Sequence, residues 1–227
     1  MEAGRRAYHA NVLDSAALLQ LLLGRYELAD RMLAQAESIW EHLGPPDASS
    51  LPLLRARYEL AVGQPSRALS TLATITFTNE DVLWMSFSAD VIRARALLQL
   101  GRAEEAERLA SASLDRFSTT PEAEELRLNK AEVLVAHGLA LTRLGRAKEA
   151  EAPLRDALAW RESNMDENSP MVAESLIALA ECYLSQGERA KARPLIERAK
   201  RIHRSHANLG EHLRAPLRKI EQRLAAR

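Results

Sequence analysis

Five glycines recur along the chain with the same kinds of residue at fixed distances on either side. They are Gly24, Gly63, Gly101, Gly145 and Gly187, spaced by 39, 38, 44 and 42 residues. The residue five positions later is always alanine, and the residue seven positions earlier is always alanine or glycine. Several matched columns over five copies predict a stack of similar units rather than one irregular core.

The matched positions after each glycine lie on one face of a helix. Leucine, isoleucine or alanine stands nine positions after each glycine. The residues twelve positions after the glycines are Ala36, Ile75, Ser113, Ala157 and Ala199. Offsets of 5, 9 and 12 are separated by steps of 4 and 3, which is the periodicity of a helix face. Because a glycine readily adopts the left-handed conformation that ends a helix, each unit is predicted to be an antiparallel helix pair.

The same register predicts the helix boundaries. First helices are expected at about 7–23, 51–62, 82–100, 121–144 and 170–186, and second helices at about 26–43, 65–76, 103–117, 147–163 and 189–206. A last helix at 210–225 places Leu213, Leu217, Ile220 and Leu224 on one face, and Pro216 is expected to trim or kink it. We therefore expect an all-α chain, with 1–227 forming one array of units at about 7–43, 51–76, 82–117, 121–163 and 170–206.

Composition supports helices and limits the class of protein. Ala, Leu, Glu and Arg dominate, and aromatic residues make up only 4%. The one cysteine, Cys182, cannot form an internal disulfide, which favours a reducing compartment. The N-terminal sequence lacks a signal-peptide pattern, and the longest apolar run, near 18–23, is too short to span a membrane. These features predict a cytoplasmic protein.

The last two units resemble the tetratricopeptide repeat family. The resemblance lies in LTRLGRAKEAEAPLRDALAW and ALAECYLSQGERAKARPLIERAKRI, and the linker SNMDENSPMVAESL is similar to that of a long-period subtype found in kinesin light chains and bacterial signalling proteins. It implies a right-handed α–α superhelix of about five hairpins with a C-terminal capping helix. It also implies a scaffold that binds proteins or peptides within a bacterial signalling or regulatory protein. The alternative is a regulatory domain that senses a small peptide or metabolite.

The second and third units depart from the family pattern. Arg55 and Glu59, and likewise Asp90 and Arg93, stand where the family prefers bulky apolar residues. Either these charges pair along their own helices at spacings of four and three, or the register slips in these two units.

The resemblance also implies a concave groove lined by the first helices. Carried over, its polar lining is Asn11, Asp14, Arg57, Arg95, Gln99, Glu132, Arg143, Glu174 and Glu181. The Lys and Asn clusters with which family members hold a terminal carboxylate are missing. A peptide or protein segment with charges of both signs and an apolar anchor is therefore the expected partner, although the groove could also be no more than the inner face of the superhelix.

No catalytic residues, metal site or cofactor are predicted, so we do not expect an enzyme. Cys182 and His137 are interpreted as packed core residues, with a buried switch as the alternative for His137. The three tryptophans are interpreted as packing between units, with a ligand-facing role as the alternative for Trp84. His203, His206 and His212 could together hold a metal, but histidines at a helix end explain them better.

The C-terminal end is basic, and this raises the question of an acidic partner. From 188 to 227 the chain has 12 Lys or Arg against 4 Glu, although the formal net charge of the whole chain is zero. No aromatic residue is interleaved there for base stacking, which argues against nucleic acid. Docking of this end on a second copy is another option, so a homodimer remains open.

Overall fold

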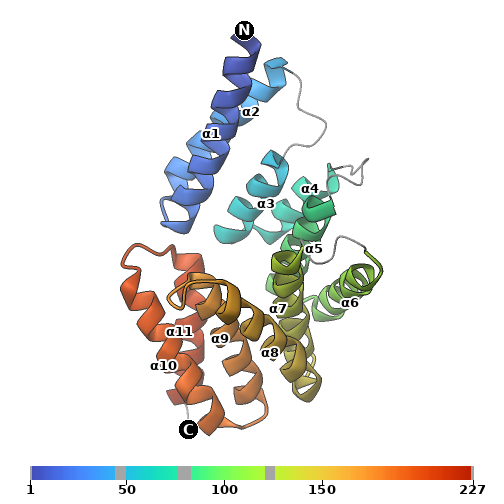
Figure 1. Ribbon diagram of the computed structural model, residues 1–227, viewed down its shortest axis with the longest axis vertical. Helices are drawn as coiled ribbons and strands as arrows, with labels where there is room; N and C mark the ends of the chain where they lie inside the picture. The colour runs from blue at the N-terminus through green and yellow to red at the C-terminus, as the bar shows by residue number, and fades with distance from the viewer. Residues whose placement is uncertain (1, 44–49, 76–82, 121–125, 226–227) are drawn as a thin grey trace.

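The computed structural model describes residues 2–43, 50–75, 83–120 and 126–225, and within these segments all regular structure is helical (Figure 1). The helices are α1 (Glu2–Leu22), α2 (Tyr26–Leu43), α3 (Leu51–Ala61), α4 (Pro65–Ala73), α5 (Leu83–Gln99), α6 (Ala103–Thr119), α7 (Arg127–Arg143), α8 (Ala147–Asn164), α9 (Pro170–Ser185), α10 (Arg189–Ser205) and α11 (Glu211–Ala225). None of the described helices is long and apolar enough to cross a membrane.

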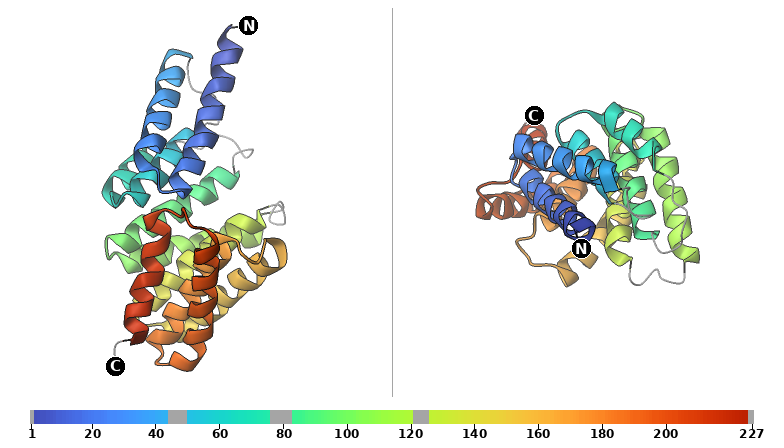
Figure 2. Two further views of the ribbon diagram at one scale, coloured as in Figure 1. Left: turned by 90° about the vertical axis from the view of Figure 1, so that its left-hand side faces the viewer. Right: turned by 90° about the horizontal axis from the view of Figure 1, so that it is seen from above.

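The helices pack as successive hairpins that wind into a superhelix (Figures 1 and 2). Each odd-numbered helix from α1 to α9 packs against the even-numbered helix that follows it. The odd-numbered helices also contact one another: α1 with α3, α3 with α5, α5 with α7, and α7 with α9. The first helices of the units therefore form the inner layer, and the second helices lie outside it. The predicted all-α superhelix of hairpins is confirmed.

The recurring glycines are the hairpin turns. All five have a positive φ, between 70° and 78°, and no other described residue does. The residue after each glycine donates its N–H to the carbonyl five positions earlier, as Arg146 does to Leu141 at 2.9 Å. This hydrogen bond satisfies a carbonyl that the end of the helix would leave without a partner. An L-residue with a side chain would be strained at these positions.

The small residues on the two helices of each hairpin are buried against each other. The alanines five positions after the turns are 0% exposed in all five units. In the second and third units, Ala56, Ala68, Ala94 and Ala106 are at most 1% exposed. The register therefore does not slip in the middle of the chain.

Gly138 is the one glycine among the small residues seven positions before the turns. The side chain of Leu154 leaves no room for a Cβ at this position. A Cβ at this position would lie 2.4 Å from Cγ of Leu154 on α8, and Leu154 is 0% exposed. The helices α7 and α8 thus approach closely because no side chain separates them at Gly138.

Two predicted helix starts and the predicted effect of Pro216 differ from the structure. The first helix begins at Glu2 rather than near residue 7. The first helix of the fourth unit begins at Arg127 rather than at 121, and residues 121–125 lie outside the described segments. Pro216 does not trim the last helix: α11 runs unbroken from Glu211 to Ala225, because the buried Leu217 and Ile220 hold it against the array.

The first hairpin turn contacts the start of the last helix, so the two ends of the array meet (Figure 2, left). The N–H of Gly210 donates to the carbonyl of Leu22 at 2.8 Å, and the Tyr26 hydroxyl lies 3.0 Å from Nδ1 of His212. The backbones touch: a Cβ on Gly24 would lie 2.8 Å from Cα of Gly210. This contact, which we call the end-to-end contact, joins residues about 186 positions apart.

Candidate functional site

Six of the nine predicted groove residues pair with one another across units. Arg57 of α3 lies 3.8 Å from Glu132 of α7, and Arg95 of α5 lies 2.8 Å from Glu174 of α9. Each pair joins a first helix to the first helix two units further along. The superhelix is therefore wound tightly enough to bring these side chains together across its inner layer.

Glu174 is held between two arginines. Its second carboxylate oxygen lies 2.9 Å from Nη1 of Arg161, a side chain on α8 that is 0% exposed. The same nitrogen lies 2.7 Å from the carbonyl of Met171 and 2.9 Å from the hydroxyl of Ser175. Burial raises the pKa of Glu174, but the charges of Arg95 and Arg161 outweigh it and lower the pKa to about 2.

This cluster has more donors than acceptors. Among the described residues, Nη2 of Arg95 and both Nε and Nη2 of Arg161 are buried without a hydrogen-bond partner. Burial lowers the pKa of Arg95, but Glu174 and Glu132 more than offset it, so the pKa is raised and the side chain stays charged. The centre of the groove thus has a surplus of cationic donors.

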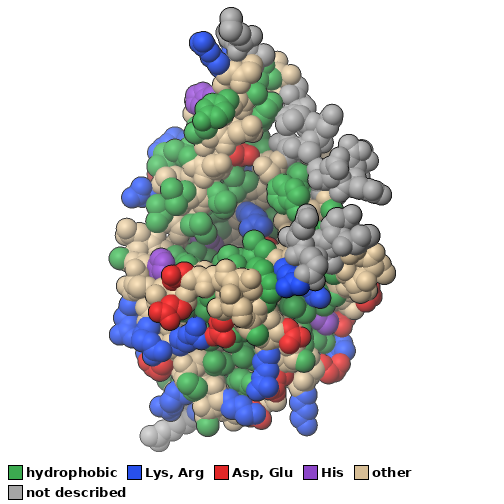
Figure 3. All heavy atoms as spheres, in the orientation of Figure 1, with side chains coloured by type: hydrophobic (Ala, Val, Ile, Leu, Met, Phe, Trp, Pro, Cys, Tyr) green, Lys and Arg blue, Asp and Glu red, His purple; other side chains and the backbone are tan. Residues whose placement is uncertain are grey.

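A second cluster lies where the first helices end. Glu181 of α9 is 3.2 Å from Nε of Arg143 on α7 and 3.4 Å from Nη1 of Arg223 on α11. The two clusters together contain five arginines and three glutamates, so they carry two excess positive charges, one of them on the fully buried Arg161. In the space-filling view, basic side chains lie in the hollow between the first hairpin and the lower units (Figure 3).

Three predicted groove residues stand apart from these clusters. Asn11 is exposed on α1, and Gln99 donates to the carbonyl of Leu60 at 3.4 Å. Asp14 is only 9% exposed and accepts a hydrogen bond from Ser50 at 3.2 Å. Burial raises the pKa of Asp14, and Glu37 adds to the effect, whereas the hydrogen bond from Ser50 opposes it.

Sequence reasoning missed Arg161 and Arg223. Arg161 follows Ala150, Leu154 and Ala157 at steps of 4 and 3, so it occupies a core position on the buried face of α8. A lone arginine on such a face is a signal that could have identified it. Arg223 gave no such signal, because its contact depends on where α11 packs.

The charged residues in the second and third units pair mostly between helices. Arg55 does not pair with Glu59: it binds Asp30 at 2.5 Å and Glu37 at 2.7 Å, both on α2. The prediction for Arg55 was wrong because the preceding unit offers closer carboxylates than its own helix does. The pairing of Asp90 with Arg93 is confirmed at 3.0 Å, and Asp90 also binds Arg116 on α6 at 2.7 Å.

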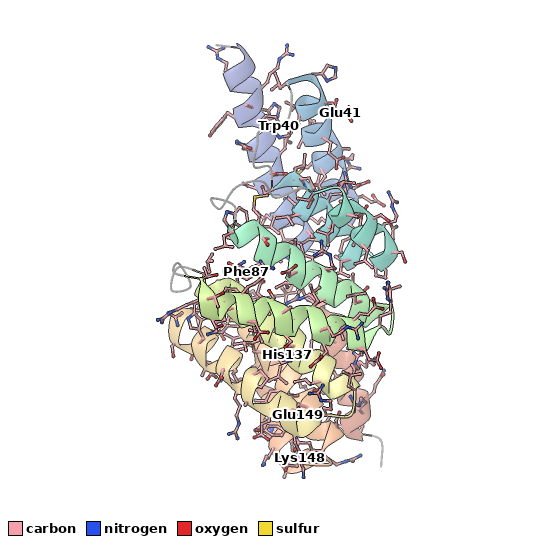
Figure 4. The ribbon with its side chains drawn as sticks, turned by 90° about the vertical axis from the view of Figure 1, so that its right-hand side faces the viewer. Trp40, Glu41, Phe87, His137, Lys148 and Glu149 are labelled. Carbon is pink, nitrogen blue, oxygen red and sulfur yellow. The ribbon has the colours of Figure 1, made fainter. Side chains whose placement is uncertain are left out.

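The other singled-out residues have mainly structural surroundings. Cys182 is a buried core thiol, as predicted, and burial raises its pKa. His137 lies within the stack between Phe87 and Glu149 (Figure 4), but it is not a fully satisfied core histidine, because its buried Nδ1 has no partner among the described residues. Trp84 is 44% exposed, so packing between units does not explain it. The described segments contain no group of His, Cys, Asp or Glu suited to a metal.

A chamber of about 330 Å³ lies at the end of the groove, under α11. Its lining comes from the α3–α4 turn, the ends of α5, α7 and α9, and one side of α11. The lining residues are Leu60, Ala61, Gly63, Gln99, Arg143, Glu181, His212, Ala215, Pro216, Lys219, Ile220 and Arg223. Burial and the nearby Arg95 lower the pKa of His212, although Glu174 opposes them. The end-to-end contact fixes the start of α11, and therefore one wall of this chamber.

Two parts of the sequence match family models described as tetratricopeptide repeat: residues 129–205, which cover α7 to α10, and residues 88–112, which lie in α5 and α6. Residues 129–205 and 88–112 contain tetratricopeptide repeats. The family recognised from the last two units is thereby confirmed, and the match extends to the less regular third unit. No curated protein is significantly similar in sequence.

Solved structures of similar fold include a Rap protein and two proteins whose names mention TPR or TPR-like repeats. A Rap protein complexed with competence and sporulation factor has a TM-score of 0.68 at 18% identity, over 86% of this chain and 54% of that one. A thermophilic TPR protein of Thermus thermophilus has a TM-score of 0.62 at 22% identity, over 94% and 99%. TPR-like repeats named for a putative kinesin light chain of Podosopora anserina give 0.55 at 20%, over 87% and 95%. The chain spans about half the length of the Rap protein.

Proposed function

We propose that this chain is a binding scaffold that holds an extended protein or peptide segment in the groove lined by its first helices. The observation that carries the proposal is the paired but unbalanced charge of that groove. Arg57, Arg143 and Arg223 keep 37–42% of their side-chain surface exposed while they contact glutamates. Such arginines can exchange or share their carboxylate partners with an incoming segment, and the surplus charge favours an acidic one.

The similarity in fold to a Rap protein complexed with competence and sporulation factor supports a segment-binding role. The same similarity and the repeat subtype support a place within a bacterial signalling or regulatory protein of the cytoplasm. The described residues hold no group of His, Cys, Asp or Glu suited to a metal, and we propose a binding protein rather than an enzyme.

A peptide array probed with the purified protein tests groove binding. We expect acidic peptides with one apolar anchor to bind, and Arg143→Glu to weaken their binding at least tenfold, because it replaces attraction by repulsion. The matched control is Arg198→Glu, since Arg198 also contacts a glutamate, Glu162, but does so between the outer helices α10 and α8. Equal binding by both variants and by the unmodified protein would contradict groove binding.

A further inference from the structure

The chamber under α11 is lined by more cationic side chains than acidic ones. Arg143, Lys219 and Arg223 line it, and Glu181 is the only carboxylate in the lining. Glu181 is already shared between the two arginines, at 3.2 and 3.4 Å. The ammonium group of Lys219 has no ion-pair or hydrogen-bond partner among the described residues. The chamber therefore carries two uncompensated positive charges, one of them on a donor that is free to bind a ligand.

The rest of the lining is apolar or neutral. Leu60, Pro216 and Ile220 provide an apolar wall, and the pKa of His212 is lowered, which keeps its imidazole neutral near pH 7. A volume of about 330 Å³ lies within the range of sites for small ligands, and is enough for one or two side chains of a peptide.

We infer that the chamber is a subsite for a doubly negative group flanked by an apolar side chain, carried on the segment that lies in the groove. Two adjacent acidic side chains and one phosphorylated serine both have this chemistry. Lys219 and the exposed edges of Arg143 and Arg223 would bind the charge, and the wall of Leu60, Pro216 and Ile220 would take the apolar neighbour. The inference rests on the proposed function, because the chamber opens where the groove ends.

The wall that carries Lys219 is held in place from the other end of the chain. Gly210 and His212 at the start of α11 are bound by Leu22 and Tyr26 of the first hairpin. The subsite thus uses residues from the second to the fifth unit and from α11, and its shape depends on the end-to-end contact. It is therefore a feature of this wound chain rather than of a single repeat.

Blocked hexapeptides of sequence Ala-Leu-X-X-Leu-Ala test the inference by titration calorimetry or by amide NMR. The X-X pair is Glu-Glu, Gln-Gln or Lys-Lys, and a fourth peptide carries phosphoserine followed by alanine. We expect the Glu-Glu and phosphoserine peptides to bind at least tenfold more tightly than Gln-Gln, and Lys-Lys to bind weakest. A phosphoserine peptide that is much tighter than Glu-Glu identifies phosphate as the group recognised, whereas similar affinities identify carboxylates as sufficient.

Two neighbouring substitutions on α11 locate the binding. Lys219→Gln should lower the affinity for the Glu-Glu peptide by about tenfold. Arg218→Gln is the matched control, because Arg218 is outside the chamber lining and pairs with Glu211. Equal affinity for Glu-Glu and Gln-Gln, equal loss in both variants, or no binding at millimolar peptide overturns the subsite. Peptides from the array that depend on Arg143 but not on Lys219 would overturn the subsite while leaving groove binding intact.

Discussion

Replacing Glu174 by glutamine should lower the free energy of unfolding, because Arg95 and Arg161 stabilise the charged carboxylate in the folded state. Lowering the pKa of this carboxyl group from its ordinary 4.5 to about 2 corresponds to roughly 3.5 kcal/mol, at about 1.4 kcal/mol per pH unit. The side chain is 28% exposed, so screening by water reduces the expected loss to about 2–3 kcal/mol at pH 7. The variant also leaves Arg95 and Arg161 facing each other with no charge between them.

The contribution of Glu174 to the free energy of unfolding should depend on pH. Because the pKa of Glu174 is lower in the folded state, its stabilising contribution is complete above about pH 5 and is lost as the pH falls toward 2. Urea unfolding followed by circular dichroism, at a series of pH values, should show the difference between the unmodified protein and Glu174→Gln shrinking over that range. Glu162→Gln, which removes a half-exposed pair with Arg198, should cost less than about 1 kcal/mol. A difference below about 1 kcal/mol at pH 7, or one that persists at pH 2, would refute this reasoning.

Three further substitutions test the packing. Gly138→Ala should destabilise the protein by about 1 kcal/mol although alanine favours helix, because its Cβ overlaps Leu154; in a Leu154→Ala background the same change should become neutral or stabilising by urea unfolding. Gly210→Ala should break the end-to-end contact, since its Cβ would lie 2.8 Å from the His212 ring and 3.1 Å from Cα of Gly24; small-angle scattering should report a larger maximum dimension at unchanged helicity. Gly145→Ala should cost about 1 kcal/mol or more in urea unfolding, because φ is 76° there.

The repeat architecture could be predicted from sequence because its determinants are local. A glycine at each turn and small residues at fixed offsets specify where two helices meet, and this information is written within each unit. The same register is present in the second and third units, although Arg55 and Asp90 interrupt the apolar pattern there. Those charges were accommodated by partners on the adjacent helices α2 and α6, and the register was kept.

The groove could be predicted only in part, because its contacts depend on how tightly the superhelix winds. The family register identified Arg57, Arg95 and Glu174, but nothing local indicates that a side chain reaches across two units. The end-to-end contact, in which Gly210 packs against Gly24, likewise could not be predicted from the sequence, because it joins segments with no shared pattern. Trp84 was assigned to packing between units, but 44% of its surface is exposed at the start of α5, and its sequence position alone does not indicate that.

The central claim is that a segment binds along the inner layer of first helices. A peptide selected on the array and labelled with a nitroxide tests it directly, because the label broadens nearby amide signals in the NMR spectrum of the protein. We predict the strongest broadening in the first helices α3, α5, α7 and α9 and in α11, with weaker broadening in the outer helices α6, α8 and α10. Broadening confined to the outer helices would contradict the account, and so would the same pattern in the Arg143→Glu variant at equal peptide concentration.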